Sequence, residues 1–439
     1  MIVCHGKFFT GKNAKVFPVD SITISLFKSK KGNKMNSYQS ILLNEGNIAE
    51  SDYLACSGIN ENHDEYFGAV APPIIQTSLF VQKNYQQYCD DMRHEAQRYI
   101  YSRGLNPTVS MVETKLALLE GGEEARCFAS GMGAISAVMV GLLNSGDHIL
   151  LVNQIYGPAI ELVKNLAKKY HIEYDIIANG DIQIIEQKIK PNTRMIYTES
   201  PGTMTMQIVD LQAIAQLATR YGIITVIDNT WPTPLFQKPL SLGFDIVIHS
   251  CTKYLSGHSD VLAGVVITRR ELMNIIRDFS HQLLGAVLSP FSAWLLLRGI
   301  RTLPVRMATH QHNAIKVIEW LATRDEVENI RHPLCATDKE KEIIRRQMCG
   351  FSGLFSFELK GAGFEEVKCF IDACRIFKPG CSWGGYESLI ISPNRGYNQS
   401  ALDDAEIPRG LIRLSLGQEN AALLIADLER AFDSLRVKP

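Results

Sequence analysis

Between residues 110 and 268 the sequence alternates short apolar runs with amphipathic stretches that have helical spacing. The apolar runs are rich in β-branched residues and include HILLVN, RMIYTES, IITVIDNT, FDIVIHSCT and AGVVIT. A strand that is apolar on both faces needs cover on both faces, which is the arrangement of a mostly parallel sheet between helices. The pattern therefore predicts an α/β fold with a large, mostly parallel sheet covered by helices.

Beyond about residue 295 the pattern changes to a smaller α+β type. A helix (HNAIKVIEWLA) precedes the strands GLFSFELK, ESLIIS and GLIRLSLG, and two further helices lie between and after them. A chain of 439 residues is about three times a typical domain, which favours more than one. We expect a basic tail at 1–51, an N-terminal arm at 52–108, a large domain at 109–295 and a C-terminal domain at 296–439.

The first 44 residues differ from the rest, with seven Lys, no Arg and one acid. Targeting peptides favour Arg and amphipathic spacing, which this segment lacks. We interpret it as a mobile basic tail, or as the product of a start upstream of a natural one at Met35.

The charge balance and the cysteines exclude several classes of protein. Lys and Arg number 45 and Asp and Glu number 46, which argues against nucleic acid or an anionic membrane as the main partner. A mean hydropathy of -0.02 excludes a polytopic membrane protein. The 10 cysteines form no CxxC pair or zinc-finger spacing, so no metal site is expected. With no secretory signal, we expect reduced thiols and a cytoplasmic protein.

The stretch FDIVIHSCTKYLSGHSDVLAG is the most informative one for chemistry. Ligands of a parallel sheet bind beyond the carboxyl ends of its strands, where Ser250, Thr252 and Lys253 stand. Hydroxyls and free amides suit a phosphate, and a lysine amine suits an aldehyde. Together they indicate a phosphorylated aldehyde cofactor held as a Schiff base. The alternative is a loop lysine that points into water, as most lysines do.

Asp228 ends the apolar run IITVIDNT, 25 residues before Lys253 (253 − 228). A carboxylate at the end of a buried strand is costly unless it meets a cation or several donors. The protonated nitrogen of a pyridine ring would be such a partner. The alternative is a turn or helix-capping aspartate.

These stretches belong to a set of seven motifs that occur in order between about Leu54 and Val437. The set comprises GAVAPPIIQTSLF, YSRGLNPT, SGMGA, IDNTW, SCTKYLSGHSD, SWGGYESLI and LIRLSLG. In this set the chain resembles the pyridoxal-phosphate enzymes of cysteine and methionine metabolism, the transsulfuration group of fold type I. The resemblance implies the fold-type-I architecture and pyridoxal 5'-phosphate as the cofactor.

The resemblance also implies roles for the residues around the cofactor. Lys253 would bind its aldehyde, Asp228 would keep its ring nitrogen protonated, and Tyr156 would stack on the ring. From the residue alone, Tyr156 could equally be a core or surface aromatic. The phosphate would be held by Gly131, Met132, Ser250 and Thr252, joined by Tyr101 and Arg103 of a neighbouring subunit.

The substrate would lie against residues of the C-terminal domain. Arg413 would bind its carboxylate through a two-bond fork, and Ser382, Trp383 and Tyr101 would line the same pocket. Without the resemblance, Arg413 would be a strand arginine in a surface ion pair. Shared sites imply a homo-oligomer, which we expect to be a tetramer built from dimers that share active sites.

Several features bear on which reaction such an enzyme would catalyse. The segment ESPGTMTM replaces the ESPxNP of many γ-type members, Trp231 and Trp383 resemble bacterial cystathionine β-lyases, and Gly157 replaces the cysteine of methionine γ-lyases. YSRGLNPT, in contrast, is more usual in γ-type enzymes. We predict a carbon–sulfur β-lyase that cleaves cystathionine to homocysteine, pyruvate and ammonia. The alternatives are γ-elimination, γ-replacement on an activated homoserine, and a non-catalytic module.

Overall fold

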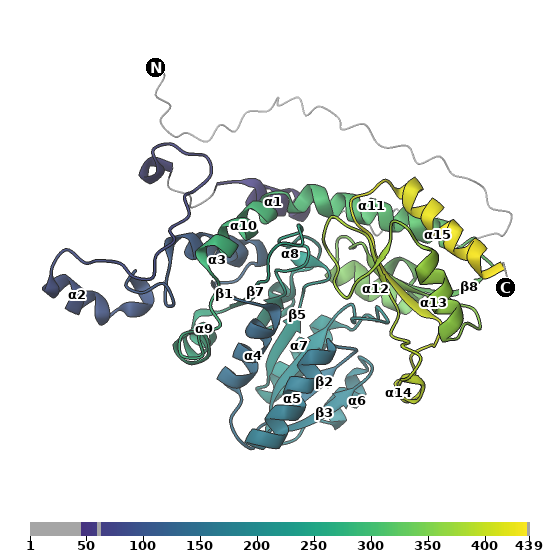
Figure 1. The fold of residues 1–439 in the computed structure, drawn as a ribbon. Coiled ribbons are helices and arrows are strands. Elements are labelled where there is room, and N and C mark those ends of the chain that lie inside the picture. The colour runs from purple at the N-terminus through teal and green to yellow at the C-terminus, as the bar shows by residue number, and fades with distance from the viewer. Residues whose placement is uncertain (1–44, 59–62, 437–439) are drawn as a thin grey trace, which may run out of the picture. The chain divides into compact units, whose positions relative to one another are not determined.

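The computed structural model describes residues 45–58 and 63–436 (Figure 1). The predictions about the basic segment at 1–44 and about Met35 lie outside the described residues. No helix in the described part of the chain is both long and apolar enough to cross a membrane.

A seven-stranded sheet with the strand order β1-β7-β6-β5-β4-β2-β3 lies at the centre of the larger half (Figure 1). Neighbouring strands among β6, β5, β4, β2 and β3 are parallel, and β7 alone runs against its neighbours β1 and β6. The strands are β1 (Glu124–Phe128), β2 (His148–Val152), β3 (Glu173–Ile177), β4 (Thr193–Glu199), β5 (Ile224–Asp228), β6 (Ile246–His249) and β7 (Gly264–Thr268). The predicted mostly parallel sheet is confirmed.

Helices cover both faces of this sheet because its strands are apolar on both. One buried cluster joins Val163 and Ala134 of the helices α5 and α4 to Val226 and Ile248, and another joins Ile214 of α7 to Val247. The helices of this half are α3 (Pro107–Glu120), α4 (Gly131–Leu142), α5 (Gly157–Tyr170), α6 (Ile182–Gln187), α7 (Leu211–Tyr221), α8 (Thr233–Phe236), α9 (Arg270–Ile275) and α10 (Pro290–Arg301). The 3-10 helix η4 (Pro239–Leu242) and the π-helix η5 (Ile276–His281) lie among them.

The two ends of α7 are set by the residues that flank it. The side chain of Asp210 accepts a hydrogen bond from the backbone N–H of Ala213, which caps the first turn. Gly222 follows the last turn with φ 66°, a left-handed conformation that glycine adopts without strain. Both ends of the helix are therefore fixed by residues next to it in the sequence.

A second, five-stranded sheet with the order β10-β11-β12-β9-β8 forms the C-terminal half. Its strands are β8 (Val327–Arg331), β9 (Leu354–Leu359), β10 (Lys378–Pro379), β11 (Leu389–Ile391) and β12 (Leu411–Ser415). Around it lie α11 (Leu303–Leu321), η6 (Pro333–Cys335), α12 (Asp338–Gln347), α13 (Phe364–Ala373), α14 (Gln399–Asp404) and α15 (Ala421–Arg436). The smaller α+β part is confirmed, whereas the exact domain boundaries stay predictions. The one between 295 and 296 falls inside α10.

The N-terminal segment contains short helices that the sequence pattern does not predict. They are α1 (Glu45–Cys56), η2 (His63–Tyr66), α2 (Tyr85–Met92) and η3 (Glu95–Gln97). The buried amine of Lys115 on α3 donates to the carbonyls of Leu54, Ala55 and Ser57 at 3.0, 3.4 and 2.5 Å. These bonds satisfy carbonyls that the last turn of a helix leaves free, so they fasten α1 to α3.

Candidate functional site

Two parallel strands end side by side in carboxylates at the carboxyl edge of the large sheet. Glu199 ends β4, Asp228 ends β5, and the two are register partners. The loop after β6 begins at Ser250 and reaches the first turn of α4, where Gly131 lies. The edge that the sequence nominates for a ligand therefore does gather polar groups from several elements.

Lys253 lies in the loop that follows β6 and faces the C-terminal half. Its amine donates to the Ser382 hydroxyl at 2.7 Å and lies 5.5 Å from the centre of the Trp383 ring. Burial, followed by the nearby charge of Arg413, lowers the pKa of the Lys253 amine. The side chain is thus held between protein groups and does not point freely into water.

Two contacts tie the lysine loop to the loop that carries Ser382 and Trp383. Ser259 donates to a carboxylate oxygen of Glu387 at 2.6 Å, and the Tyr254 ring lies 5.4 Å from the Trp383 ring. These contacts fix the position of Ser382 and Trp383 opposite Lys253.

Asp228 accepts hydrogen bonds from both the backbone N–H and the hydroxyl of Thr230, the former at 3.0 Å. Burial raises the pKa of the Asp228 carboxyl, while Thr230, His249 and Lys253 oppose that rise. A carboxylate that is buried with several donors suits the cationic partner predicted for it. The capping alternative explains the Thr230 bonds but not the nearby amine of Lys253.

The start of α4 forms a cradle beside Ser250. The Ser130 hydroxyl caps the helix by accepting from Gly133 N–H at 3.0 Å. A Cβ on Gly131 would lie 2.9 Å from both Cβ and Oγ of Ser250, so only glycine allows this approach. The first N–H groups of a helix have no partner inside the helix and attract anions, which fits the predicted phosphate site at Gly131 and Met132.

Thr252 differs from Ser250 in how its hydroxyl is used. The Thr252 Oγ1 exchanges hydrogen bonds with the backbone of Ala263, donating at 3.2 Å and accepting at 3.1 Å. This hydroxyl holds the lysine loop against the start of β7. A role in phosphate binding stays a prediction for Thr252, as it does for Ser250.

Arg413 lies in the middle of β12 and is only 6% exposed. Its guanidinium contacts the Thr203 carbonyl at 3.5 Å, the Met204 sulfur at 3.6 Å and the Cys381 carbonyl at 3.5 Å. Burial lowers its pKa to about 10. Within the described residues no carboxylate pairs with it, so the alternative of a surface ion pair is wrong.

Tyr156 immediately precedes α5 and is 45% exposed. Its backbone N–H donates to Glu199 at 2.6 Å, which fixes the residue at the edge of the sheet. Burial raises the pKa of the Tyr156 phenol, and the nearby Cys381 and Glu199 add to that rise. The phenol therefore keeps its proton, and the core alternative for this residue is wrong.

Tyr101 and Arg103 lie apart from this group. The Arg103 guanidinium stacks on the Tyr101 ring at 5.0 Å, and Tyr101 is 44% exposed. In the part of the chain that the structure describes, neither side chain forms a hydrogen bond or ion pair with the groups around Lys253. Their predicted action on a neighbouring subunit's site stays a prediction.

Glu199 is a residue of this edge to which the sequence analysis assigns no role. It is 8% exposed, its carboxyl group accepts a hydrogen bond from the Tyr156 backbone N–H, and it stands beside Asp228. The signal in the sequence that could have identified Glu199 is the same as for Asp228, namely an acidic residue at the end of an apolar strand.

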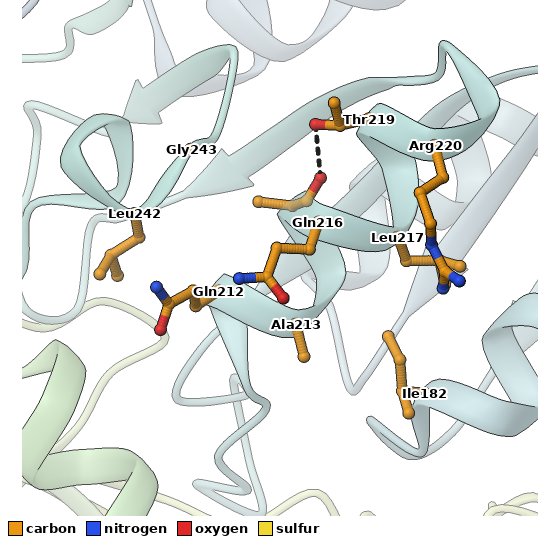
Figure 2. A pocket seen from close by; sticks show the side chains of 10 residues that line it. Ile182, Gln212, Ala213, Gln216, Leu217, Thr219, Arg220, Leu242 and Gly243 are labelled. Carbon is orange, nitrogen blue, oxygen red and sulfur yellow. Dashed lines mark hydrogen bonds between the residues drawn. The ribbon is translucent and has the colours of Figure 1, made fainter.

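A cavity of about 600 Å³ lies elsewhere, along α7 (Figure 2). Gln212, Gln216 and Arg220 point toward it from α7, and Ile182 and Leu242 approach from the flanking segments. None of the predicted site residues lines it. It is therefore separate from the edge that carries Lys253.

The group around Lys253 fits a phosphorylated pyridine aldehyde. An amine of lowered pKa suits the aldehyde, and the close approach at Gly131 leaves a helix start for the phosphate. The buried Asp228 suits a ring cation, and the buried Arg413 suits a substrate carboxylate. That these groups act together on one cofactor stays a prediction.

Comparison with characterised proteins places this geometry in a family. An L-methionine gamma-lyase of Fusobacterium nucleatum subsp. polymorphum is 39% identical over 84% of this chain and 95% of its own length. A cystathionine gamma-lyase of Bacillus subtilis is 37% identical over 85% of this chain and 96% of its own. A cystathionine beta-lyase of Lactococcus lactis subsp. cremoris is 37% identical over 84% and 96%.

Solved structures agree with the sequence matches. The structure described as a putative O-acetylhomoserine (thiol)-lyase from Campylobacter jejuni has a TM-score of 0.81 at 30% identity, over 88% of this chain and all of its own. That structure contains a lysine joined to pyridoxyl phosphate. The family model for Cys/Met metabolism PLP-dependent enzymes matches residues 56–433. The chain belongs to this family of Cys/Met metabolism enzymes, whose cofactor is pyridoxal 5'-phosphate.

Proposed function

We propose that this protein is a carbon–sulfur lyase that converts a sulfur amino acid to a thiol, ammonia and a 2-oxo acid. One observation carries the proposal: the amine of Lys253 lies near a buried guanidinium, Arg413, that has no carboxylate partner among the described residues. A base beside an open carboxylate site is what removal of the Cα proton of an amino acid requires.

Arg413 would bind the substrate carboxylate with two parallel hydrogen bonds. This would orient the Cα–H bond toward Lys253, and burial lowers the pKa of that amine, which shifts it toward the neutral form that can accept a proton. Bound pyridoxal phosphate supplies the electron sink for the pair left at Cα. Asp228 would hold the proton on the ring nitrogen, and Tyr156 would stack on the ring and offer a protonated phenol near the leaving sulfur.

The first candidate is elimination at Cβ, with cystathionine as substrate. Trp383 supports it because the indole that resembles the β-lyases lies 5.5 Å from the Lys253 amine. Trp231 does not add to this support. It is 5% exposed and its indole N–H donates to the Leu354 carbonyl at 2.9 Å, so it serves the packing between the two sheets.

The second candidate is elimination at Cγ, of cystathionine or methionine. Two of the three relatives named above are γ-lyases, and all three are about equally similar to this chain. Both candidates use the same amine and the same carboxylate site, so the identity of the 2-oxo acid must decide between them.

Purified holoenzyme incubated with cystathionine provides the test. Cleavage at Cβ gives pyruvate and homocysteine, whereas cleavage at Cγ gives 2-oxobutanoate and cysteine. Cystine and methionine serve as second substrates, and Lys253→Ala serves as the inactive control. Release of no 2-oxo acid from any of the three, together with synthesis of a thioether from an activated homoserine, would show a transferase and contradict the proposal.

The assembly and location of the protein are part of the same proposal. We propose a homo-oligomer in which Tyr101 and Arg103 reach the phosphate site of a neighbouring subunit, and a cytoplasmic location. The exposure of Tyr101 supports the first point, because an aromatic ring left 44% exposed is available to a partner.

A further inference from the structure

Two buried carboxyl groups share the edge of the sheet where the cofactor would bind. Glu199 and Asp228 are register partners on the neighbouring parallel strands β4 and β5. Paired residues of parallel strands point to the same face, so both side chains lie on the face that α4 and α5 cover. Two negative charges so close together in a poorly hydrated place repel strongly, so only one is expected to ionise.

The hydrogen bonds distinguish the two groups. Asp228 accepts two hydrogen bonds, from the N–H and from the hydroxyl of Thr230, and the Lys253 amine lies nearby. Glu199 accepts one N–H, that of Tyr156, at 2.6 Å. The surroundings therefore stabilise a charge on Asp228 better than a charge on Glu199.

We propose that Glu199 is a positioning residue that remains an uncharged carboxylic acid, holds Tyr156 through its backbone N–H, and leaves the negative charge of this edge to Asp228. The proposal rests on the proposed function, because it concerns the residues predicted to hold the cofactor ring. Burial and the charge of Asp228 raise the pKa of the Glu199 carboxyl well above its ordinary value, and the bond from Tyr156 only partly opposes them.

Glu199→Gln separates the protonation state of Glu199 from its hydrogen bond with Tyr156. Glutamine has the same shape and keeps an oxygen that accepts the Tyr156 N–H, but it cannot ionise. Glu199→Ala removes the acceptor altogether. Glu328→Gln, on the exposed part of β8, provides a control for the loss of a carboxyl group elsewhere.

The first measurement is the thermal stability of the cofactor-free protein from about pH 5 to about pH 9. A carboxyl whose pKa is raised by folding contributes stability that is complete below its unfolded pKa and is lost as the pH rises through the folded one. Wild type should therefore lose stability relative to Glu199→Gln as the pH rises. The other groups near Glu199 are Asp228, Tyr197 and Tyr156, with Lys253 beyond them, and they are present in both proteins.

The second measurement is the affinity of the cofactor-free protein for pyridoxal phosphate. Glu199→Gln should bind within about twofold of wild type, and Glu199→Ala about tenfold more weakly, as loss of one buried hydrogen bond implies. If Glu199→Ala does not fold, the glutamine variant still decides the matter. Parallel stability curves for wild type and Glu199→Gln, or weak cofactor binding by Glu199→Gln, would overturn the proposal.

These outcomes are separate from those of the proposed function. If the stability curves diverge but the protein releases no 2-oxo acid, the role proposed for Glu199 is supported and the proposed lyase activity is contradicted. If the curves are parallel and the protein is an active lyase, the lyase activity is supported and the role proposed for Glu199 is contradicted.

Discussion

Arg413 shows how the burial of a single charged side chain can indicate its function. The residue is 6% exposed, and among the residues that the structure describes its guanidinium contacts two carbonyls and a thioether at 3.5–3.6 Å. A buried cation without an anion is costly, and a substrate carboxylate would remove that cost. The sequence predicts the residue only through the family resemblance, because an arginine in a strand is usually at the surface.

Arg413→Lys keeps the charge but loses the planar fork, since an ammonium makes only point contacts. We expect kcat/KM for the substrate to fall by about 10²-fold, with the visible absorbance of the cofactor unchanged. Steady-state kinetics and absorption spectra check both parts. Near-normal kcat/KM, or loss of the cofactor, would show that another basic residue binds the carboxylate.

Glu199 marks the limit of sequence reasoning at the residue scale. An acid at the end of an apolar strand is visible in the sequence, but its neighbour is not. Only the register of β4 against β5 shows that Glu199 and Asp228 stand side by side. Register depends on contacts between strands distant in sequence, which a single sequence does not display.

At the scale of elements, the start of α4 joins the phosphate prediction to the fold. Gly131→Ala would place a Cβ 2.9 Å from Ser250 and push the helix start away from the lysine loop. We expect cofactor affinity to fall about tenfold or more, because overpacking costs about 1–3 kcal/mol and about 1.4 kcal/mol corresponds to a tenfold change. Gly157 lies at the start of α5, where an added Cβ would have no neighbouring atom within 4 Å. The variant Gly157→Ala should therefore bind the cofactor normally. Equal affinities in the two variants would contradict the cradle.

The elements that the sequence predicts are those with a strong apolar pattern. β2 lies in the apolar run HILLVN and is buried at every position. β8 (VENIR) is partly exposed and lies in no such run. The helix α12 (DKEKEIIRRQ) is highly charged, so its apolar pattern does not predict it, although Thr337 and Glu340 form a capping box. Neither element has the apolar pattern on which the sequence predictions depend.

At the scale of the whole molecule, the role of Tyr101 and Arg103 cannot be read from one chain. Both lie on the N-terminal segment, and the motif YSRGLNPT assigns them to a neighbouring site only by resemblance. Mixing inactive Arg103→Ala with inactive Lys253→Ala subunits should restore part of the activity, because one hybrid site would carry both native residues. No recovery after verified subunit exchange would place both residues in the site of their own chain.

The central claim is that Lys253 carries the cofactor, and chemical reduction tests it most directly. Borohydride treatment of the holoenzyme, followed by digestion and mass spectrometry, should find the pyridoxyl phosphate group on the peptide that contains Lys253. Lys253→Ala treated in the same way should carry no such group. A modification on another lysine, or none in wild-type protein that retains its cofactor, would contradict the account.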